Sequence, residues 1–328
     1  MLELCVIGDP VAHSLSPAIH TALLAQRGLK GRYQAVTVRP EELAAFVERA
    51  RQGAYNGFNV TMPHKQTILP LLDAVEGDAA AMGAVNTVVV RQGRAVGYNT
   101  DGAGFVRSLP FGAEGKRVLV LGSGGAAAAV CRALVQAGAE VTVCCRHPEK
   151  TAGWGVTACS WELLPSAAAQ CSLLVNATPL GMTGRESFAD FHFLERCRGW
   201  VYDLVYEPRE TALLTAARAR GLPVIGGLAL LHAQAELAFE LFIQYNRQKK
   251  RLTAAGRQSF IISYWRGIGC FAAALWPQRI GKARVLPEAV SRRQRIPWRY
   301  RRFAWRLWRS NPRRSSERIP PSARRRRP

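Results

Sequence analysis

The sequence lacks the features of several protein classes. Eight cysteines occur in 328 residues, but no two form a CxxC pair, and most have apolar or small neighbours. We therefore expect reduced thiols in a core, and we expect no metal site. The first residues also lack the basic leader and apolar run of a signal peptide. These absences favour a cytoplasmic protein without disulfides.

Net charge is absent from the first three quarters of the chain. Residues 1–246 hold 21 Lys and Arg against 21 Asp and Glu, whereas residues 247–328 hold 24 basic and 2 acidic residues. All of the formal charge of +22 therefore belongs to the last segment. The neutral body gives no reason to expect nucleic-acid or membrane binding by residues 1–246.

The tail, residues 247–328, has a composition that fits no ordinary class. It contains 21 Arg, no Asp and five of the eight Trp, whereas disordered segments are usually poor in Trp and folded domains balance bases with acids. One interpretation is a frameshifted or read-through reading frame. The alternative is a polybasic arm that binds RNA or anionic lipid. Residues 259–276 are almost apolar, but Arg266 would cost roughly 3 kcal/mol at a bilayer centre, so no transmembrane helix is predicted.

The body has the alternation of an α/β protein. An N-terminal α/β substrate domain is predicted for residues 1–101, and a Rossmann-type doubly wound domain for residues 102–227. A closing helix, residues 228–246, completes the first domain, and the basic extension is not expected to be a folded domain. The predicted strands are 2–8, 33–38, 55–60, 118–121, 140–145, 173–176, 200–204 and 222–225, with a hairpin of 85–90 and 95–98; the helices begin near Ser16 and Pro40 and span 125–137, 209–220 and 228–242.

Three polar clusters follow short apolar strands within fifty residues, at residues 57–65, 83–87 and 97–105. Hydrogen-bonding side chains at strand ends are typical of the mouth of a cleft. Lys65 taken alone reads as a surface charge, but paired with Asp101 it could transfer a proton to a substrate hydroxyl.

The other polar residues near these clusters also carry two interpretations. Asn59, Asn86 and Asn99 read either as turn residues bonded to their own backbone or, for Asn86 with Thr61, as partners of substrate hydroxyls. Ser14 and Ser16, in HSLSP, read either as a helix cap, with Ser16 at the N-cap position, or as a carboxylate site at a helix start.

A glycine-rich turn follows the strand at residues 118–121. Gly122, Gly124 and Ala127 give the spacing GxGxxA between a buried strand and an alanine-rich helix, which indicates a dinucleotide site. About twenty residues later an NAD site would place an acid, but Arg146 stands there with Lys150 one turn on. A guanidinium suits the 2′-phosphate of NADP. The alternative is a solvent-facing basic loop.

These segments, in this order, resemble the shikimate dehydrogenase family from residue 1 to about residue 242. The family's motifs HSLSP, NVTxPxK, GAVNT, NTDxxG, GxGGA, NATPLGM and DLVYxP match residues 13–17, 59–65, 83–87, 99–104, 122–126, 176–182 and 203–208. The resemblance implies NADPH-dependent reduction of 3-dehydroshikimate to shikimate, in the route to chorismate and the aromatic amino acids.

The resemblance also implies residue roles. Ser14 and Ser16 would hold the substrate carboxylate, and Lys65 with Asp101 would carry proton transfer. The hydroxyls would be held by Thr61, Asn86, Asp101 and Gln234, with Tyr206 closing the pocket; the cofactor would be held by Gly122, Ser123, Gly124, Gly125, Ala126, Cys145, Arg146, Lys150, Leu204 and Gly227.

Two positions depart from the family pattern. Its cofactor loop usually reads Asn-Arg-Thr, whereas Cys145 and His147 flank Arg146 here, which loses polar contacts beside the arginine. Its closing helix usually begins GLGML, whereas residues 227–231 read GLALL here, with Ala229 and without the methionine. The alternatives are a quinate or shikimate dehydrogenase that also uses NAD, and an idle member that binds nucleic acid or anionic membrane through its tail. Whether the chain is a homodimer stays open.

Overall fold

The computed structural model describes the backbone of residues 1–254 and the side chains of residues 1–244. Residues 1–254 belong to one compact unit. Apart from the backbone of residues 247–254, the tail lies outside the described residues, and so do the predictions for it, including the apolar stretch at 259–276. Within residues 1–254, no helix is both long and apolar enough to cross a bilayer.

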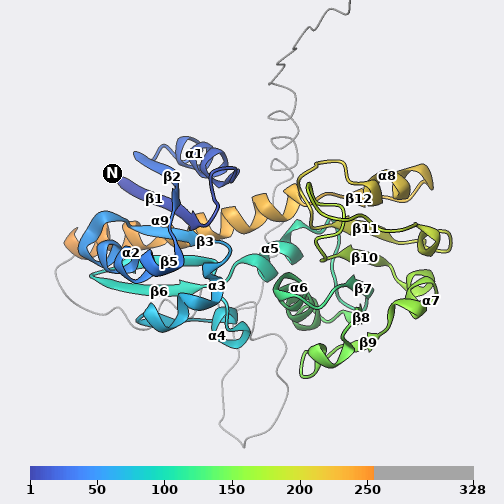
Figure 1. The fold of residues 1–328 in the computed structure, drawn as a ribbon. Helices are drawn as coiled ribbons and strands as arrows, with labels where there is room; N and C mark the ends of the chain where they lie inside the picture. Colours follow the sequence, from blue (N-terminus) through green and yellow to red (C-terminus); the bar gives the residue numbers. More distant parts are fainter. Residues whose placement is uncertain (255–328) are drawn as a thin grey trace, which may run out of the picture. The chain divides into compact units, whose positions relative to one another are not determined.

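The first sheet mixes parallel and antiparallel strands (Figure 1). Its order is β2-β1-β3-β5-β6-β4, with β1 parallel to both β2 and β3. The predicted hairpin is confirmed as β5 and β6, joined by Gln92 and Gly93, which have φ of 48° and 75° as a type I′ turn requires. The strands are β1 (Leu2–Gly8), β2 (Gly31–Thr37), β3 (Gly57–Val60), β4 (Ala74–Val75), β5 (Thr87–Arg91) and β6 (Arg94–Tyr98).

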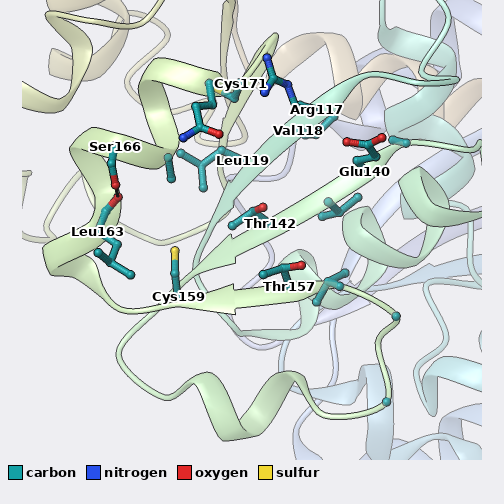
Figure 2. Close-up of a pocket in the computed structure, with 17 residues that line it drawn as sticks. Arg117, Val118, Leu119, Glu140, Thr142, Thr157, Cys159, Leu163, Ser166 and Cys171 are labelled. Atoms are coloured by element: carbon teal, nitrogen blue, oxygen red, sulfur yellow. Dashed lines mark hydrogen bonds between the residues drawn. The ribbon is translucent and has the colours of Figure 1, made fainter.

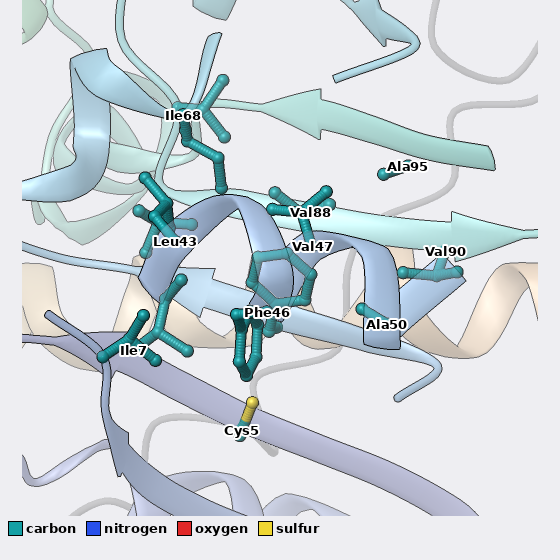
Figure 3. Packing of buried hydrophobic residues seen from close by; sticks show 14 of the residues in the cluster. Cys5, Ile7, Leu43, Phe46, Val47, Ala50, Ile68, Val88, Val90 and Ala95 are labelled. Carbon is teal, nitrogen blue, oxygen red and sulfur yellow. The ribbon is translucent and has the colours of Figure 1, made fainter. Parts of the chain in front are cut away.

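Helix α2 (Leu43–Arg49) packs on this sheet through one apolar face. It buries Leu43, Phe46 and Val47, the spacing of one helical face. Phe46 meets Phe58 of β3 edge to face, with ring centroids 5.1 Å apart. Figure 3 shows Leu43, Phe46 and Val47 within this cluster of buried apolar residues. The remaining helices of this part are α1 (Ser16–Gln26), α3 (His64–Thr67), α4 (Asp78–Met82) and α5 (Asp101–Ser108).

The second sheet is wholly parallel, in the order β12-β11-β10-β7-β8-β9. This is the doubly wound order, in which ligands bind where the direction of winding reverses, here between β7 and β10. The predicted fold class is confirmed. The elements are β7 (Arg117–Leu121), α6 (Gly125–Gln136), β8 (Glu140–Cys144), β9 (Thr157–Cys159), α7 (Leu164–Gln170), β10 (Leu173–Asn176), β11 (Trp200–Asp203), α8 (Ala212–Ala219), β12 (Val224–Ile225) and α9 (Leu228–Ala254).

Several element boundaries differ from the predictions. Helix α8 begins at Ala212 and not at Arg209, because Thr211 is the N-cap and its hydroxyl accepts a hydrogen bond from the Leu214 N–H at 3.2 Å. Helix α9 continues past residue 246 to Ala254, over a stretch without Gly or Pro. Seven cysteines within residues 1–254 are free thiols and six of them are buried, as expected.

His20 of α1 is fully buried. Its ring stacks on Tyr33 with centroids 4.2 Å apart, and neither ring nitrogen has a hydrogen-bond partner among the described residues. Burial lowers the pKa of His20 from 6.5 to about 3.

The buried imidazole predicts an acid-sensitive fold. The folded state holds His20 neutral, while the unfolded state binds a proton below pH 6.5. The contribution of His20 to stability is therefore full above pH 6.5 and is lost as pH falls from 6.5 toward 3, by roughly 2 kcal/mol at pH 5. Urea unfolding at pH 7.5 and pH 5 should show this loss in the wild-type chain and a smaller loss in His20→Phe. Equal losses in the two proteins would contradict the prediction.

Candidate active site

A pocket of about 500 Å³ gathers residues from both sheets and from α9. Every predicted substrate and catalytic residue lines it. They are Ser14, Ser16, Thr61, Lys65, Asn86, Asp101, Tyr206 and Gln234, joined by the predicted cofactor residues Ala126, Leu204 and Gly227. Segments that are far apart in the sequence therefore meet around one space of the size of a small polyol and part of a dinucleotide.

An ion pair lies in this pocket. Lys65 Nζ is 2.6 Å from Asp101 Oδ2, and the side chains are 34% and 24% exposed. Lys65 is the second residue of α3, just after β3, and its carbonyl accepts the Val85 N–H at 2.8 Å. Asp101 opens α5, where the helix dipole favours a carboxylate. The predicted pairing is present, in a partly dry site suited to moving one proton.

Asn86 fixes the other oxygen of Asp101. Its Nδ2 donates to Asp101 Oδ1 at 2.8 Å and to Thr100 Oγ1 at 3.0 Å, and its Oδ1 accepts the Thr100 N–H at 2.9 Å. Because both amide ends have partners, the amide has one orientation. Each oxygen of Asp101 thus has its own donor.

The turn interpretation holds for Asn99 and is wrong for Asn59. Asn99 Oδ1 accepts the N–H of Asp101 two residues on, at 3.0 Å. Asn59 is buried and bonds instead to distant residues: its Oδ1 accepts from Tyr33 Oη at 2.7 Å, and its Nδ2 donates to Thr87 Oγ1 at 3.0 Å. Asn59 therefore ties three strands together, and it lines the pocket itself.

The two serines lie where the chain enters α1. Leu15, not Ser16, is the N-cap residue, and no side chain caps the helix. Ser14 Oγ accepts the Ser16 N–H at 3.2 Å, and Ser16 is 8% exposed. The capping interpretation of Ser16 is therefore wrong. Ser14 and Ser16 both line the pocket, as a role in binding the substrate carboxylate requires. That role stays a prediction.

Tyr206 and Gln234 lie on the loop after β11 and on α9. Burial raises the pKa of Tyr206, the Glu207 carboxylate adds to this, and the Lys65 cation opposes it. Tyr206 therefore stays a neutral phenol close to the ion pair. Gln234 Oε1 accepts from Thr100 Oγ1 at 3.4 Å, and its Nε2 donates to the Leu231 carbonyl at 3.0 Å.

A buried network holds the ends of β10 and β11 together. Asp203 Oδ1 accepts from Asn176 Nδ2 at 2.9 Å and from the Val205 N–H at 3.0 Å, and its Oδ2 accepts from Thr211 Oγ1 at 2.6 Å. Burial raises the pKa of Asp203, while these three donors oppose that rise. The two motif residues Asn176 and Asp203 thus support the loop that carries Tyr206.

The glycine-rich turn leaves space for a dinucleotide. Gly122 has φ of 107°, and a Cβ there would lie 2.9 Å from Thr178 Cγ2, so the turn requires glycine. A Cβ on Gly124 or Gly125 would meet nothing within 4 Å. The start of α6 therefore faces open space with its backbone N–H groups, which fits a pyrophosphate. Ser123 lies in the same turn.

The other residues predicted to hold the cofactor differ in exposure. Arg146 and Lys150 are exposed just beyond β8. Cys145 is only 2% exposed, and its backbone N–H donates to the Cys159 carbonyl at 3.1 Å. Gly227 packs against the Leu204 backbone, where a Cβ would lie 2.3 Å from the carbonyl oxygen. Cys145 belongs to the buried core cluster of this sheet, unlike the exposed Arg146 and Lys150.

A second hollow, of about 960 Å³, lies over β7, β8 and β9 (Figure 2). Its labelled polar side chains include Arg117, Glu140, Thr142 and Thr157. It contains none of the predicted catalytic or cofactor residues.

Some residues at the site were not predicted. Thr100, directly before Asp101 in the sequence, bonds to Asn86 and Gln234 and so links two predicted substrate residues from behind the pocket lining. Asp9, His13 and Glu207 line the pocket itself. Asp9 follows β1, and a polar residue at that strand end was the signal that could have found it.

The parallel doubly wound sheet, its open glycine-rich turn and the ion-paired pocket beside it define a dinucleotide-dependent dehydrogenase. Residues 6–88 match the family model described as the shikimate dehydrogenase substrate binding domain, and residues 109–183 match a model for NAD(P) binding. The chain is also 45% identical over 252 residues to the shikimate dehydrogenase (NADP(+)) of Synechococcus sp. (strain JA-3-3Ab), covering 73% of this chain and 87% of that protein. This chain belongs to the shikimate dehydrogenase family.

Solved structures agree with this assignment. The shikimate 5-dehydrogenase from Thermus thermophilus, in complex with NADP(H) and shikimate, is 40% identical with a TM-score of 0.68, over 74% of this chain and 94% of that one. The quinate dehydrogenase from Corynebacterium glutamicum, in complex with NAD, is 31% identical with a TM-score of 0.67, over 77% and 99%.

Proposed function

We propose that the chain catalyses the reversible NADPH-dependent reduction of 3-dehydroshikimate to shikimate. The observation that carries the proposal is the Lys65 and Asp101 ion pair at 2.6 Å, set in a pocket with every residue predicted to hold the substrate. The high identity to relatives named shikimate dehydrogenase (NADP(+)) supports it.

The substrate would be held at two ends. The Ser14 and Ser16 hydroxyls would bind its carboxylate, while Thr61, Asn86 and Gln234 would bind its ring hydroxyls. These neutral groups would select the substrate by the positions of its hydroxyls. An analogue that lacks one of the hydroxyls would leave a polar group of the site without a hydrogen-bond partner, so it would bind more weakly. Tyr206, a neutral phenol, would cover the ring.

Proton transfer would fall to the ion pair. Bound NADPH supplies a hydride to the C3 carbonyl carbon. Lys65 Nζ would donate a proton to the carbonyl oxygen as negative charge develops there, and its positive charge would stabilise that oxygen. Asp101 Oδ2 would orient the ammonium and balance its charge, while Asn86 keeps the carboxylate in place through Oδ1.

NADP is the cofactor that the residues favour. The turn at residues 122–126 would take the pyrophosphate at the start of α6. Arg146 would pair with the 2′-phosphate, helped by Lys150, since no acid stands at the end of β8 to repel it. The buried Cys145 thiol leaves only its backbone for such a contact.

The second candidate is a dehydrogenase that also accepts quinate and NAD. The likeness to a quinate dehydrogenase in complex with NAD favours keeping it. Turnover of the purified full chain should be compared with shikimate and quinate, each with NADP⁺ and NAD⁺. We expect efficient turnover with shikimate and NADP⁺ alone; comparable efficiency with quinate or NAD⁺ would establish the broader enzyme.

We also propose that the enzyme acts in the cytoplasm. The seven free thiols within the described residues support this, because reduced cysteines are usual there. Antibody detection in fractionated source cells would test it: recovery with an extracytoplasmic fraction would contradict the proposal.

A further inference from the structure

Helix α5, which begins with Asp101, packs against both α6 and α9 (Figure 1). Helix α6 carries Ala126 and Val130 on the pocket wall, and α9 carries Gln234 there. The catalytic carboxylate therefore sits on a helix held between the cofactor-side helix and the substrate-side helix.

Two glycines make these contacts close. A Cβ on Gly102 would lie 2.8 Å from the Ala129 carbonyl oxygen and 3.0 Å from Ala133 Cβ, both on α6. A Cβ on Gly104 would lie 2.7 Å from Gln234 Cβ and 2.8 Å from its backbone nitrogen, on α9. The two positions are two residues apart and so lie about 200° apart around the helix.

We infer that Gly102 is a positioning residue that sets the place of Asp101 relative to Lys65 and the cofactor. An added methyl group on Gly102 meets a backbone oxygen, which cannot swing aside as a side-chain end would. If α5 moves away from α6, Gly104 moves toward α9. No space is left there, because the backbone of Gly104 already packs against the backbone of Gln234. The strain is therefore relieved by moving Asp101 or Gln234, and both line the pocket.

The inference rests on the proposed function, since it concerns the placing of the carboxylate for proton transfer. Its effect should appear in turnover and not in dinucleotide binding. The turn at residues 122–126 precedes the contact on α6, which is made at Ala129 and Ala133. A displacement near 1 Å at a catalytic group costs up to about 100-fold in rate.

The test compares Gly102→Ala with Gly112→Ala in the full chain. Gly112 is exposed, and a Cβ there would meet nothing within 4 Å, so it controls for the substitution itself. We measure kcat and KM for shikimate, the Kd of NADPH by its fluorescence, and thermal unfolding. Gly102→Ala should lose about 10- to 100-fold in kcat, while its Kd for NADPH should stay within about twofold of the wild-type value. Gly112→Ala should match wild type in kcat and in the Kd for NADPH.

A kcat for Gly102→Ala equal to that of Gly112→Ala would overturn the inference. It would also be overturned if the fall in kcat were fully explained by the fraction of Gly102→Ala that is unfolded at the assay temperature. If Gly102→Ala does not fold, Ala133→Val crowds the same contact from α6; a kcat loss with NADPH binding kept supports the inference, and an unchanged kcat overturns it. Wild-type protein that binds NADPH but does not oxidise shikimate would instead overturn the proposed function, and the inference with it.

Discussion

Replacing Lys65 with alanine is expected to abolish most turnover while leaving substrate affinity nearly unchanged. The substitution removes the proton donor and the cation that faces the developing charge on oxygen. Interactions that strengthen in the transition state lower kcat when they are lost, and they alter KM little. We expect a loss of about 10³-fold in kcat, the usual range for a general acid, with KM for shikimate within about threefold.

Lys116→Ala is the matched control for this prediction. Lys116 is an exposed lysine just before β7, and it does not line the pocket. Its loss should leave both constants near wild type. Near-normal kcat in Lys65→Ala would refute the catalytic assignment, and a rise in KM alone would reduce Lys65 to a binding residue.

Replacing Arg146 with alanine is expected to remove the preference for NADP. Hydrogen bonds between a guanidinium and a phosphate are charge-assisted, so their loss costs about 1.5–3 kcal/mol, or roughly 10- to 150-fold in affinity. NAD lacks the 2′-phosphate and should bind Arg146→Ala as it binds wild type. The measurement is kcat/KM for NADP⁺ and for NAD⁺ at saturating shikimate.

Arg94→Ala provides the control for the change in surface charge. Arg94 is exposed in the β5 and β6 hairpin of the first sheet, and it does not line the pocket. A fall in kcat/KM for NADP⁺ of similar size in both variants would show a general charge effect. An unchanged ratio of NADP⁺ to NAD⁺ efficiency in Arg146→Ala would show that Arg146 is only a solvent-facing residue.

The nucleotide-binding sheet could be predicted from local signals. The strand at residues 118–121 is a continuous apolar run, and the turn after it needs a positive φ at residue 122, which is a glycine. The signals for the strand, the turn and the helix therefore all lie within a few residues. The strand β9 and the short helix α7 were not predicted, because elements of three and seven residues are too short to show a clear hydrophobic periodicity.

The pocket could be predicted only in part, since motifs give residue types and not partners. The pairing of Lys65 with Asp101 is predictable from two signals: both residues follow short apolar strands, and their charges are complementary. The bonds of Asn59 to Tyr33 and Thr87 could not be foreseen, since they join three strands whose register is set by long-range packing. The burial of Cys145 likewise depends on β9 lying beside β8.

The most direct test of the central claim is reduction of NADP⁺ by the purified full chain with shikimate as the electron donor, followed through the absorbance of NADPH. The account predicts steady turnover that requires both compounds, is lost in Lys65→Ala and is kept in Lys116→Ala. Folded protein that binds NADPH but shows no reduction of NADP⁺ or NAD⁺ with shikimate would contradict it.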